Sequence, residues 1–272
     1  MQKGGLSCLI SQIVTDYTSG KSIEELARKY GCNSEAIRYR LIKNNISRRA
    51  PSTYRKNFVD RDFFNAIDSE EKAWILGFIA SDGSVRKYNR GYYLSIEIQK
   101  DDEEILRTIS KIMKSNYPLY RRPGANCVRF TISSKKIVNS LIENGIVQNK
   151  TNTISYPTKI PHYLNRHFIR GVFDGDGWLC YDKNKRFHMG FCGNKPLLSS
   201  ILSFIQKEAN VDPVKILQGS ATKRENIVQM TFSSKKNIAK LIKYFYNNPS
   251  IYLPRKKKLV DLFCEKNAAL VM

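Results

Sequence analysis

The sequence predicts an α+β protein built from a pseudo-twofold pair of half-domains, each with the order α-β-β-α-β-β-α, preceded by a small all-α domain. The first supporting observation is a repeated segment. Ile75–Ser84 and Ile169–Trp178 are both apolar runs that contain a Gly and end in Asp-Gly. The second is a repeated junction, FTISSKK at Phe130–Lys136 and MTFSSKK at Met230–Lys236. Two matches in the same order indicate a duplicated half rather than chance similarity.

Residues 1–47 are the predicted all-α domain. Apolar residues recur there at helical spacing in three short segments. Ser22 followed by Glu25 has the pattern of a capping box, and a Gly-containing turn separates the second helix from the third. This arrangement is typical of a helix-turn-helix. A helical bundle without DNA contact is the alternative. In the DNA-binding interpretation, the third helix presents to the major groove Arg38, Tyr39 and Lys43.

Residues 48–69 are polar and basic and are predicted to be a linker, residues 70–157 the first half-domain, and residues 158–272 the second. In Tyr93–Gln99, apolar and polar residues alternate, which predicts a strand with one face on the core. The first half is predicted to contain helix Glu70–Ser81, two strands in Val85–Gln99, helix Asp101–Met113, strands Tyr117–Arg122 and Cys127–Ile132, and helix Ser134–Asn144. The second is predicted to contain helix Arg166–Asp174, strand Phe187–Phe191, helix Leu197–Ala209, strands Lys215–Gln218 and Ile227–Phe232, and helix Lys235–Tyr246.

The chain is strongly basic, with 46 Lys and Arg against 24 Asp and Glu and a net charge of +22. Such an excess favours a polyanionic partner, most simply nucleic acid. No run of apolar residues is long enough to span a membrane. The six cysteines form no CxxC pair, which argues against a zinc ribbon and fits reduced thiols. We therefore expect an intracellular protein, cytoplasmic or nucleoid-associated, with an organelle of a eukaryote as a further possibility.

Asp82 and Asp176 end the two repeated apolar segments. Gly77 and Gly171 lie inside the same predicted helices, where glycine costs about 1 kcal/mol against alanine but lets a second backbone approach. If the helices pack there, the two acids meet. Two carboxylates about 5 Å apart would repel by roughly 3 kcal/mol at an effective dielectric of about 20. A divalent cation reverses that penalty, so the pair predicts a metal site for phosphodiester hydrolysis. The alternative is a helix stop followed by a turn.

The segments ILGFIASDG and IRGVFDGDG resemble the paired LAGLIDADG motifs of the homing endonuclease family, and the matching element order covers roughly residues 70–265. The resemblance implies that the two motif helices form the interface between the halves and that two antiparallel sheets form a DNA-binding saddle. It also implies that Asp82 and Asp176 bind catalytic Mg²⁺ or Mn²⁺. The first acid of the motif is kept as Asp174 but replaced by Ala80; this position is not the usual metal ligand.

Members of that family also place a polar strand residue and a lysine near each acid. By resemblance, Gln99 and Lys150 take these roles in the first half. In the second half, Lys256 is the best match for the lysine, with Arg255 or Lys257 as alternatives, and the polar residue has no clear counterpart except Gly193 or Asn194. We therefore expect an asymmetric site. The alternative role for both lysines is contact with a DNA phosphate.

Outward positions of the predicted strands should contact bases or phosphates of the target. In the first half these positions are Arg86, Tyr88, Tyr93, Ser95, Glu97, Arg121, Arg122 and Arg129. In the second half they are Tyr181, Lys183, Arg186, His188, Lys223, Arg224 and Gln229.

These observations favour a monomeric, sequence-specific DNA endonuclease that cuts both strands of a long, partly asymmetric double-stranded target, encoded in an intron or as a free-standing gene. By resemblance, cleavage leaves short 3′ overhangs. The main alternative is a non-enzymatic protein on the same fold, either a DNA-binding regulator or an RNA maturase. A decayed homing gene whose product binds without cutting is a third.

Overall fold

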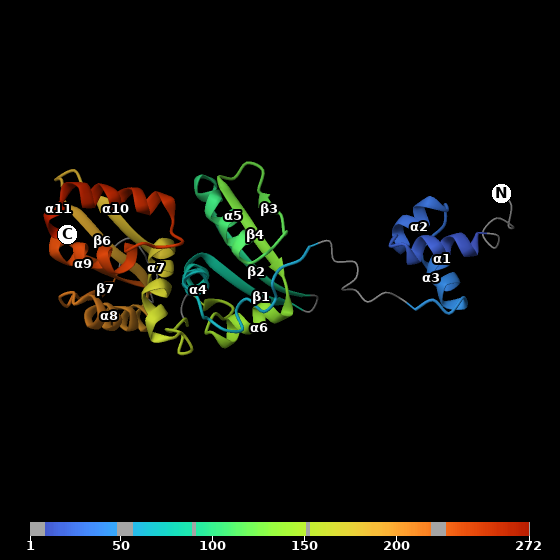
Figure 1. The fold of residues 1–272 in the computed structure, drawn as a ribbon, viewed down its shortest axis with the longest axis horizontal. Helices are drawn as coiled ribbons and strands as arrows, with labels where there is room; N and C mark the ends of the chain where they lie inside the picture. Colours follow the sequence, from blue (N-terminus) through green and yellow to red (C-terminus); the bar gives the residue numbers. More distant parts are fainter. Residues whose placement is uncertain (1–8, 48–56, 89–90, 151–152, 219–226, 272) are drawn as a thin grey trace. The chain divides into compact units, whose positions relative to one another are not determined.

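The computed structural model describes residues 9–47, 57–88, 91–150, 153–218 and 227–271. The chain divides into two units, Met1–Asn57 and Phe58–Met272. The described part of the first unit folds into helices α1 (Ile10–Thr18), α2 (Ile23–Lys29) and α3 (Ser34–Lys43) (Figure 1). The predicted capping box is present, because the Ser22 hydroxyl accepts from the Glu25 amide and the Glu25 carboxylate accepts from the Ser22 amide. All three helices contribute to one small core, formed by Ile13, Tyr17, Ile23, Leu26, Ala27, Ile37 and Leu41.

The first half of the second unit follows the predicted order. Its elements are α4 (Glu70–Asp82), β1 (Gly83–Tyr88), β2 (Gly91–Gln99), α5 (Glu103–Ile112), β3 (Leu119–Arg121), β4 (Cys127–Ser133) and α6 (Lys135–Glu143). The strands form an antiparallel sheet in the order β1-β2-β4-β3.

The second half repeats this arrangement. Its elements are α7 (Asn165–Asp176), β5 (Gly177–Tyr181), β6 (Phe187–Asn194), α8 (Lys195–Ala209), β7 (Ile216–Gln218), β8 (Ile227–Phe232) and α9 (Lys235–Tyr246). The sheet order is β5-β6-β8-β7, which matches the first sheet strand for strand. The predicted α+β pair of half-domains is therefore confirmed. Two helices that the sequence pattern did not predict, α10 (Pro254–Lys266) and α11 (Ala268–Val271), follow the second half. No helix in the described ranges is long and apolar enough to cross a membrane.

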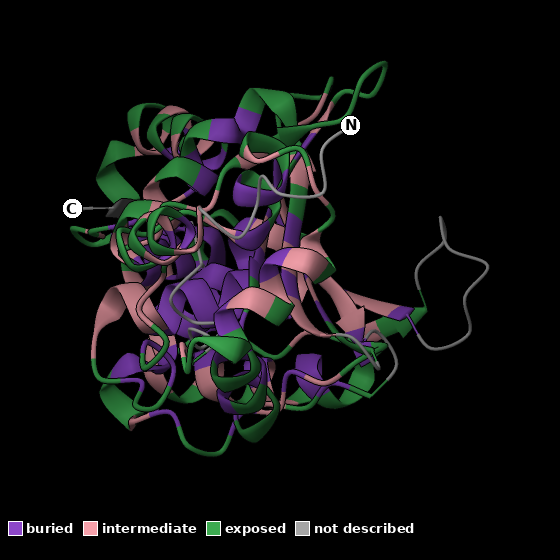
Figure 2. Ribbon diagram, turned by 90° about the vertical axis from the view of Figure 1, so that its right-hand side faces the viewer, coloured by how far each residue is buried: buried purple, intermediate pink, exposed green. Residues whose placement is uncertain are grey.

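Each sheet has one face against its helices and a second face toward solvent, because burial alternates along the strands. We call the solvent sides the first and second outer faces. The first outer face consists of Ser84, Arg86, Tyr88, Tyr93, Ser95, Glu97, Gln99, Tyr120, Cys127, Arg129 and Thr131. The second outer face consists of Trp178, Cys180, His188, Gly190, Cys192, Leu217, Gln229 and Thr231, and it ends at the buried pair Asn194 and Ile227. Figure 2 shows the buried residues gathered in the interior, with most exposed residues around them.

The end of the predicted linker belongs to the second unit instead. Phe63, Phe64 and Ile67 are buried in its main core. The amide of Asp60 donates to the Met113 carbonyl at 3.0 Å, which ties the segment to the end of α5. Three apolar residues within a polar stretch were the available signal, and burial of such side chains is favourable enough to attach the segment to the core. Residues 48–56 lie outside the described residues.

Helices α4 and α7 pack together through Gly77 and Gly171, as the sequence predicted. A Cβ atom added to Gly77 would lie 2.1 Å from the Phe168 carbonyl oxygen, and one added to Gly171 would lie 2.1 Å from the Trp74 carbonyl oxygen. Both distances are far below van der Waals contact, so only glycine permits this backbone approach. The close packing brings the C-terminal ends of the two helices, and hence the two motif acids, to one place.

Candidate active site and nucleic-acid interface

The two motif acids are the last residues of α4 and α7. The two acids lie close together, because a Cβ atom added to Gly175, the residue before Asp176, would lie 2.9 Å from Oδ2 of Asp82. Burial, followed by repulsion from Asp176, raises the pKa of Asp82 to about 6. Burial also raises the pKa of Asp176, against the opposing influence of nearby lysines and a hydrogen bond from Ser81. The site therefore gathers two carboxylates whose ionised forms are disfavoured until positive charge is supplied.

Two buried lysines supply part of that charge. Nζ of Lys150 donates to the Ser81 carbonyl at 2.9 Å, directly before the first acid. Nζ of Lys256 donates to the carbonyl oxygens of Phe173, of Gly177 at 2.5 Å and of Gly175 at 3.4 Å. Burial lowers the pKa of both ammonium groups, that of Lys256 to about 8.

The structure decides between the three candidate cations of the second half. The side chain of Lys256 is 2% exposed and lies on the end of α7. Arg255 instead pairs with Asp102, and Lys257 pairs with Asp261. The two selected lysines also differ from each other. The ammonium of Lys256 has three carbonyl acceptors for its three N–H groups, whereas Lys150 contacts one such carbonyl.

Strand register identifies the counterpart of Gln99 in the second half. Gln99 ends β2 opposite Cys127, and Asn194 ends β6 opposite Ile227. Asn194 is therefore the equivalent position rather than Gly193. The two side chains do different things: Gln99 is exposed, whereas the amide of Asn194 is buried and donates to the Ile154 carbonyl at 2.7 Å. The expected asymmetry thus appears in the polar strand residues as well.

Asp174, the retained first acid of the second motif, has a structural position. Its carboxylate accepts hydrogen bonds from Nε1 of Trp74 at 2.9 Å, from the hydroxyl of Tyr246 at 2.7 Å and from the amide of Leu253 at 3.1 Å. Complete burial raises its pKa. These bonds join α4 to α7 and to the segment that leads into α10. Ala80 stands at the equivalent place in α4 and needs no such partners.

Most of the predicted contact residues lie on the outer faces or at their ends. The first outer face includes Arg86, Tyr88, Tyr93, Ser95, Glu97 and Arg129. The second includes His188 and Gln229, and the β5–β6 turn exposes Lys183 and Arg186. In the first unit, Tyr39 is 64% exposed on α3, beside Arg38 and Lys43. Lys223 and Arg224 lie outside the described residues.

Two predicted contact residues, Arg121 and Tyr181, lie on the opposite side of their sheets. The guanidinium of Arg121 forms a two-pronged pair with Glu103 of α5, at 2.7 and 2.8 Å. Tyr181 packs against Phe187, with ring centroids 4.5 Å apart. Their placement on the outward side of the strands was wrong, because neighbouring strand residues point to opposite faces and a shift of one position reverses the direction of a side chain.

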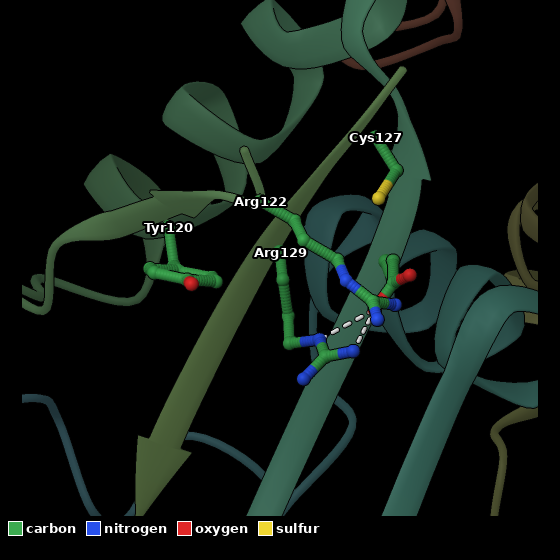
Figure 3. A pocket seen from close by; sticks show the side chains of 5 residues that line it. Tyr120, Arg122, Cys127 and Arg129 are labelled. Atoms are coloured by element: carbon green, nitrogen blue, oxygen red, sulfur yellow. Dashed lines mark hydrogen bonds and ion pairs between the residues drawn. The ribbon is translucent and has the colours of Figure 1, made fainter. Parts of the chain in front are cut away.

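The first outer face also contains a pocket of about 370 Å³, lined by Glu97, Tyr120, Arg122, Cys127 and Arg129 (Figure 3). The carboxylate of Glu97 pairs with the guanidinium of Arg129. Sequence reasoning missed Tyr120, which is 58% exposed and lines the same pocket as Arg122 and Arg129, and Trp178 on the second outer face. Alternation along β5 was the signal that could have identified Trp178, whereas the three-residue strand β3 gives too short a pattern to identify Tyr120.

The donor set around the acids is limited. The described residues contain no group of three or more His, Cys, Asp and Glu side chains placed to hold a metal ion. The two carboxylates and the carbonyl oxygens at the helix ends are hard ligands that suit Mg²⁺, which commonly keeps several waters or phosphate oxygens. The residues present therefore fit a metal shared with a phosphate.

Comparison with known families decides the classification. The WhiA LAGLIDADG-like domain model matches residues 71–122 and 165–251. The chain belongs to the LAGLIDADG family. Among solved structures, the meganuclease I-AabMI bound to uncleaved DNA is similar with a TM-score of 0.51 and 13% identity, over 75% of this chain and 91% of that one. The meganuclease I-SmaMI bound to uncleavable DNA is similar with a TM-score of 0.50 and 13% identity, over 72% and 90%. These likenesses show the LAGLIDADG fold. No curated protein sequence matches the chain.

Proposed function

We propose that this LAGLIDADG protein is a metal-dependent endonuclease that cuts both strands of double-stranded DNA at a specific site. One observation supports this more than any other: the half-buried Asp82 and the more exposed Asp176 meet at the ends of two helices that pack through glycines, and each helix end is contacted by a buried lysine. A protein that only binds DNA gains nothing from the burial and the repulsion by Asp176 that together raise the pKa of Asp82.

The proposed metal is Mg²⁺ or Mn²⁺, held by Asp82 and Asp176. When bound, such an ion supplies an acidic water and stabilises charge on a phosphate. Two kinds of side chain in the site suit such an ion. The carboxylates provide hard oxygen ligands, and the two lysines partly balance the negative charge of Asp82 and Asp176. Lys150, with one carbonyl contact, is better placed than Lys256 to donate to a phosphate oxygen.

Duplex DNA is the proposed partner because the chain has a net charge of +22 and the first outer face presents arginine and tyrosine side chains. Two sheets of the same topology can follow two neighbouring segments of a groove. The family resemblance implies a monomer on a long, partly asymmetric site. DNA contact by Arg38, Tyr39 and Lys43 of α3 stays a prediction of the same proposal.

The test uses the full chain, a randomised duplex library and Mg²⁺, with sequencing of cut ends. The native chain should produce double-strand breaks at one sequence. Asp82→Asn and Asp176→Asn should bind the selected duplex with nearly native affinity and should not cut both strands. Asp212→Asn, which makes the same change at an exposed acid, is the matched control and should cut normally. Double-strand cleavage by either motif variant would refute the proposal.

A non-catalytic DNA-binding regulator is the second candidate, and the matching family model, a WhiA LAGLIDADG-like domain, favours it. It predicts a selected duplex that is bound and never cut under any divalent metal. The library experiment separates the two functions, since binding and cleavage are scored on the same DNA.

A further inference from the structure

The two outer faces differ in chemistry although they share one topology. The first outer face includes three charged side chains, Arg86, Glu97 and Arg129. The described strands β5, β6, β7 and β8 include no Lys, Arg, Asp or Glu. The two sheets have equivalent strand registers, so each residue of the first outer face can be compared with the residue at the same position of the second.

The position two residues after each motif acid shows the contrast. In the first sheet it is Ser84, opposite Ser95, whose hydroxyl lies 3.0 Å from that of Thr131. In the second sheet it is Trp178, opposite Gly190. The indole lies over this glycine, where an added Cβ atom would be 2.4 Å from its ring. A polar row in one half is thus replaced by an aromatic surface in the other.

One further matched pair shows a similar contrast, whereas Thr131 and Thr231 are alike and Gln229 keeps a polar side chain at the position of Arg129. Tyr120 and Leu217 are equivalent, opposite Arg129 and Gln229, and Leu217 is 57% exposed. Cys180 of the second outer face is also exposed. An exposed leucine, a tryptophan and a thiol cannot read base edges through paired hydrogen bonds. They can contact the methyl group of thymine, which is the apolar feature of the major groove.

We infer that the two sheets recognise different bases: the first outer face and Arg122 read guanine, and the second outer face reads thymine methyl groups. The inference rests on the proposed DNA interface and specifies its substrate. Arginine can donate two hydrogen bonds to O6 and N7 of guanine, and Arg122 and Arg129 both line the pocket of Figure 3. Glu97 lines the same pocket. The acceptor oxygens of Glu97 fix the orientation of Arg129.

The experiment is a binding selection from a randomised duplex with the full chain. Expected sites have one half rich in G·C pairs and one half rich in A·T pairs. Arg122→Ala should lower the preference for guanine in the first half-site by roughly 5- to 150-fold at one base pair, which also identifies that half. Arg121→Ala is the matched control, since this neighbouring arginine faces α5. It should leave the base preference unchanged.

The second half-site has its own pair of variants. Leu217→Ala should reduce the preference for thymine, whereas Leu270→Ala, a leucine of α11 that is 49% exposed, should not. Sites with equal base composition in both halves, or an Arg122→Ala variant with native preference, would overturn the inference while DNA binding stands. Failure to retain any duplex would overturn the proposed function and the inference together. Retention of DNA with no thymine contribution would assign the apolar face to a protein partner instead.

Discussion

The glycine contact between α4 and α7 allows a quantitative prediction. Gly171→Ala adds one methyl group that would lie 2.1 Å from the Trp74 carbonyl oxygen and 2.9 Å from the Phe78 amide nitrogen. Both neighbours are backbone atoms, so no side chain can rotate away and the helices must separate. Overpacking of this kind typically costs about 1–3 kcal/mol, and alanine regains roughly 1 kcal/mol of helix propensity. At the upper end, we expect a net loss of about 2 kcal/mol in the free energy of unfolding.

Urea unfolding of the full chain measures this loss, and the same preparation is assayed for cleavage of the selected duplex. Separation of the helices moves the ends that position Asp82 and Asp176. The cleavage rates of the two DNA strands should therefore both fall. Gly193→Ala is the control, because its added methyl group meets only Leu198 at 3.5 Å, an ordinary contact. A Gly171→Ala variant as stable and as active as the native chain would show that the close approach does not set the site.

Two further predictions concern buried acids. Asp174→Ala leaves three buried donors without an acceptor, and at about 1–3 kcal/mol each the free energy of unfolding should fall by at least roughly 3 kcal/mol; urea unfolding with a native midpoint would contradict this role. The pKa of Asp82 is raised from 3.8 to about 6, so its ionisation opposes folding as pH rises through this range. With a chelator present, the native chain should therefore lose about 2 kcal/mol more than Asp82→Asn between pH 4 and pH 7. Equal pH dependence in urea titrations of the two proteins would refute that burial penalty.

Much of the fold could be predicted because local patterns specify it. The duplicated Asp-Gly segments and the repeated SSKK junction predicted two equivalent halves, and alternation in β2 predicted which of its side chains face solvent. The meeting of the acids could also be predicted, since glycine weakens a helix interior and is favourable there mainly where a second backbone comes close. These features can be recognised in short stretches of sequence without knowledge of their partners in the fold.

The site was harder to predict where one residue of register decides the outcome. Arg121 and Arg122 are equally basic in the sequence, yet Arg121 pairs with Glu103 and Arg122 lines the pocket of the first outer face. The short strand β3 does not specify which of the two points outward until it pairs with β4. The helix α10 was also not predicted. It contains Lys256, whose ammonium group contacts α7 only after the chain has folded.

By itself, then, the sequence determined the duplicated α+β architecture, the pair of metal-suited acids and the basic character that favours a nucleic-acid partner. Only the tertiary structure decided that Lys256 rather than Arg255 or Lys257 reaches α7, and that Asn194 is the counterpart of Gln99. It alone assigned Asp174 to the joint between α4, α7 and α10. The physical reason is the separation of the interacting residues along the chain. Helix and strand periodicity depends on neighbouring residues, whereas these contacts join residues far apart in the chain and form only when the halves pack.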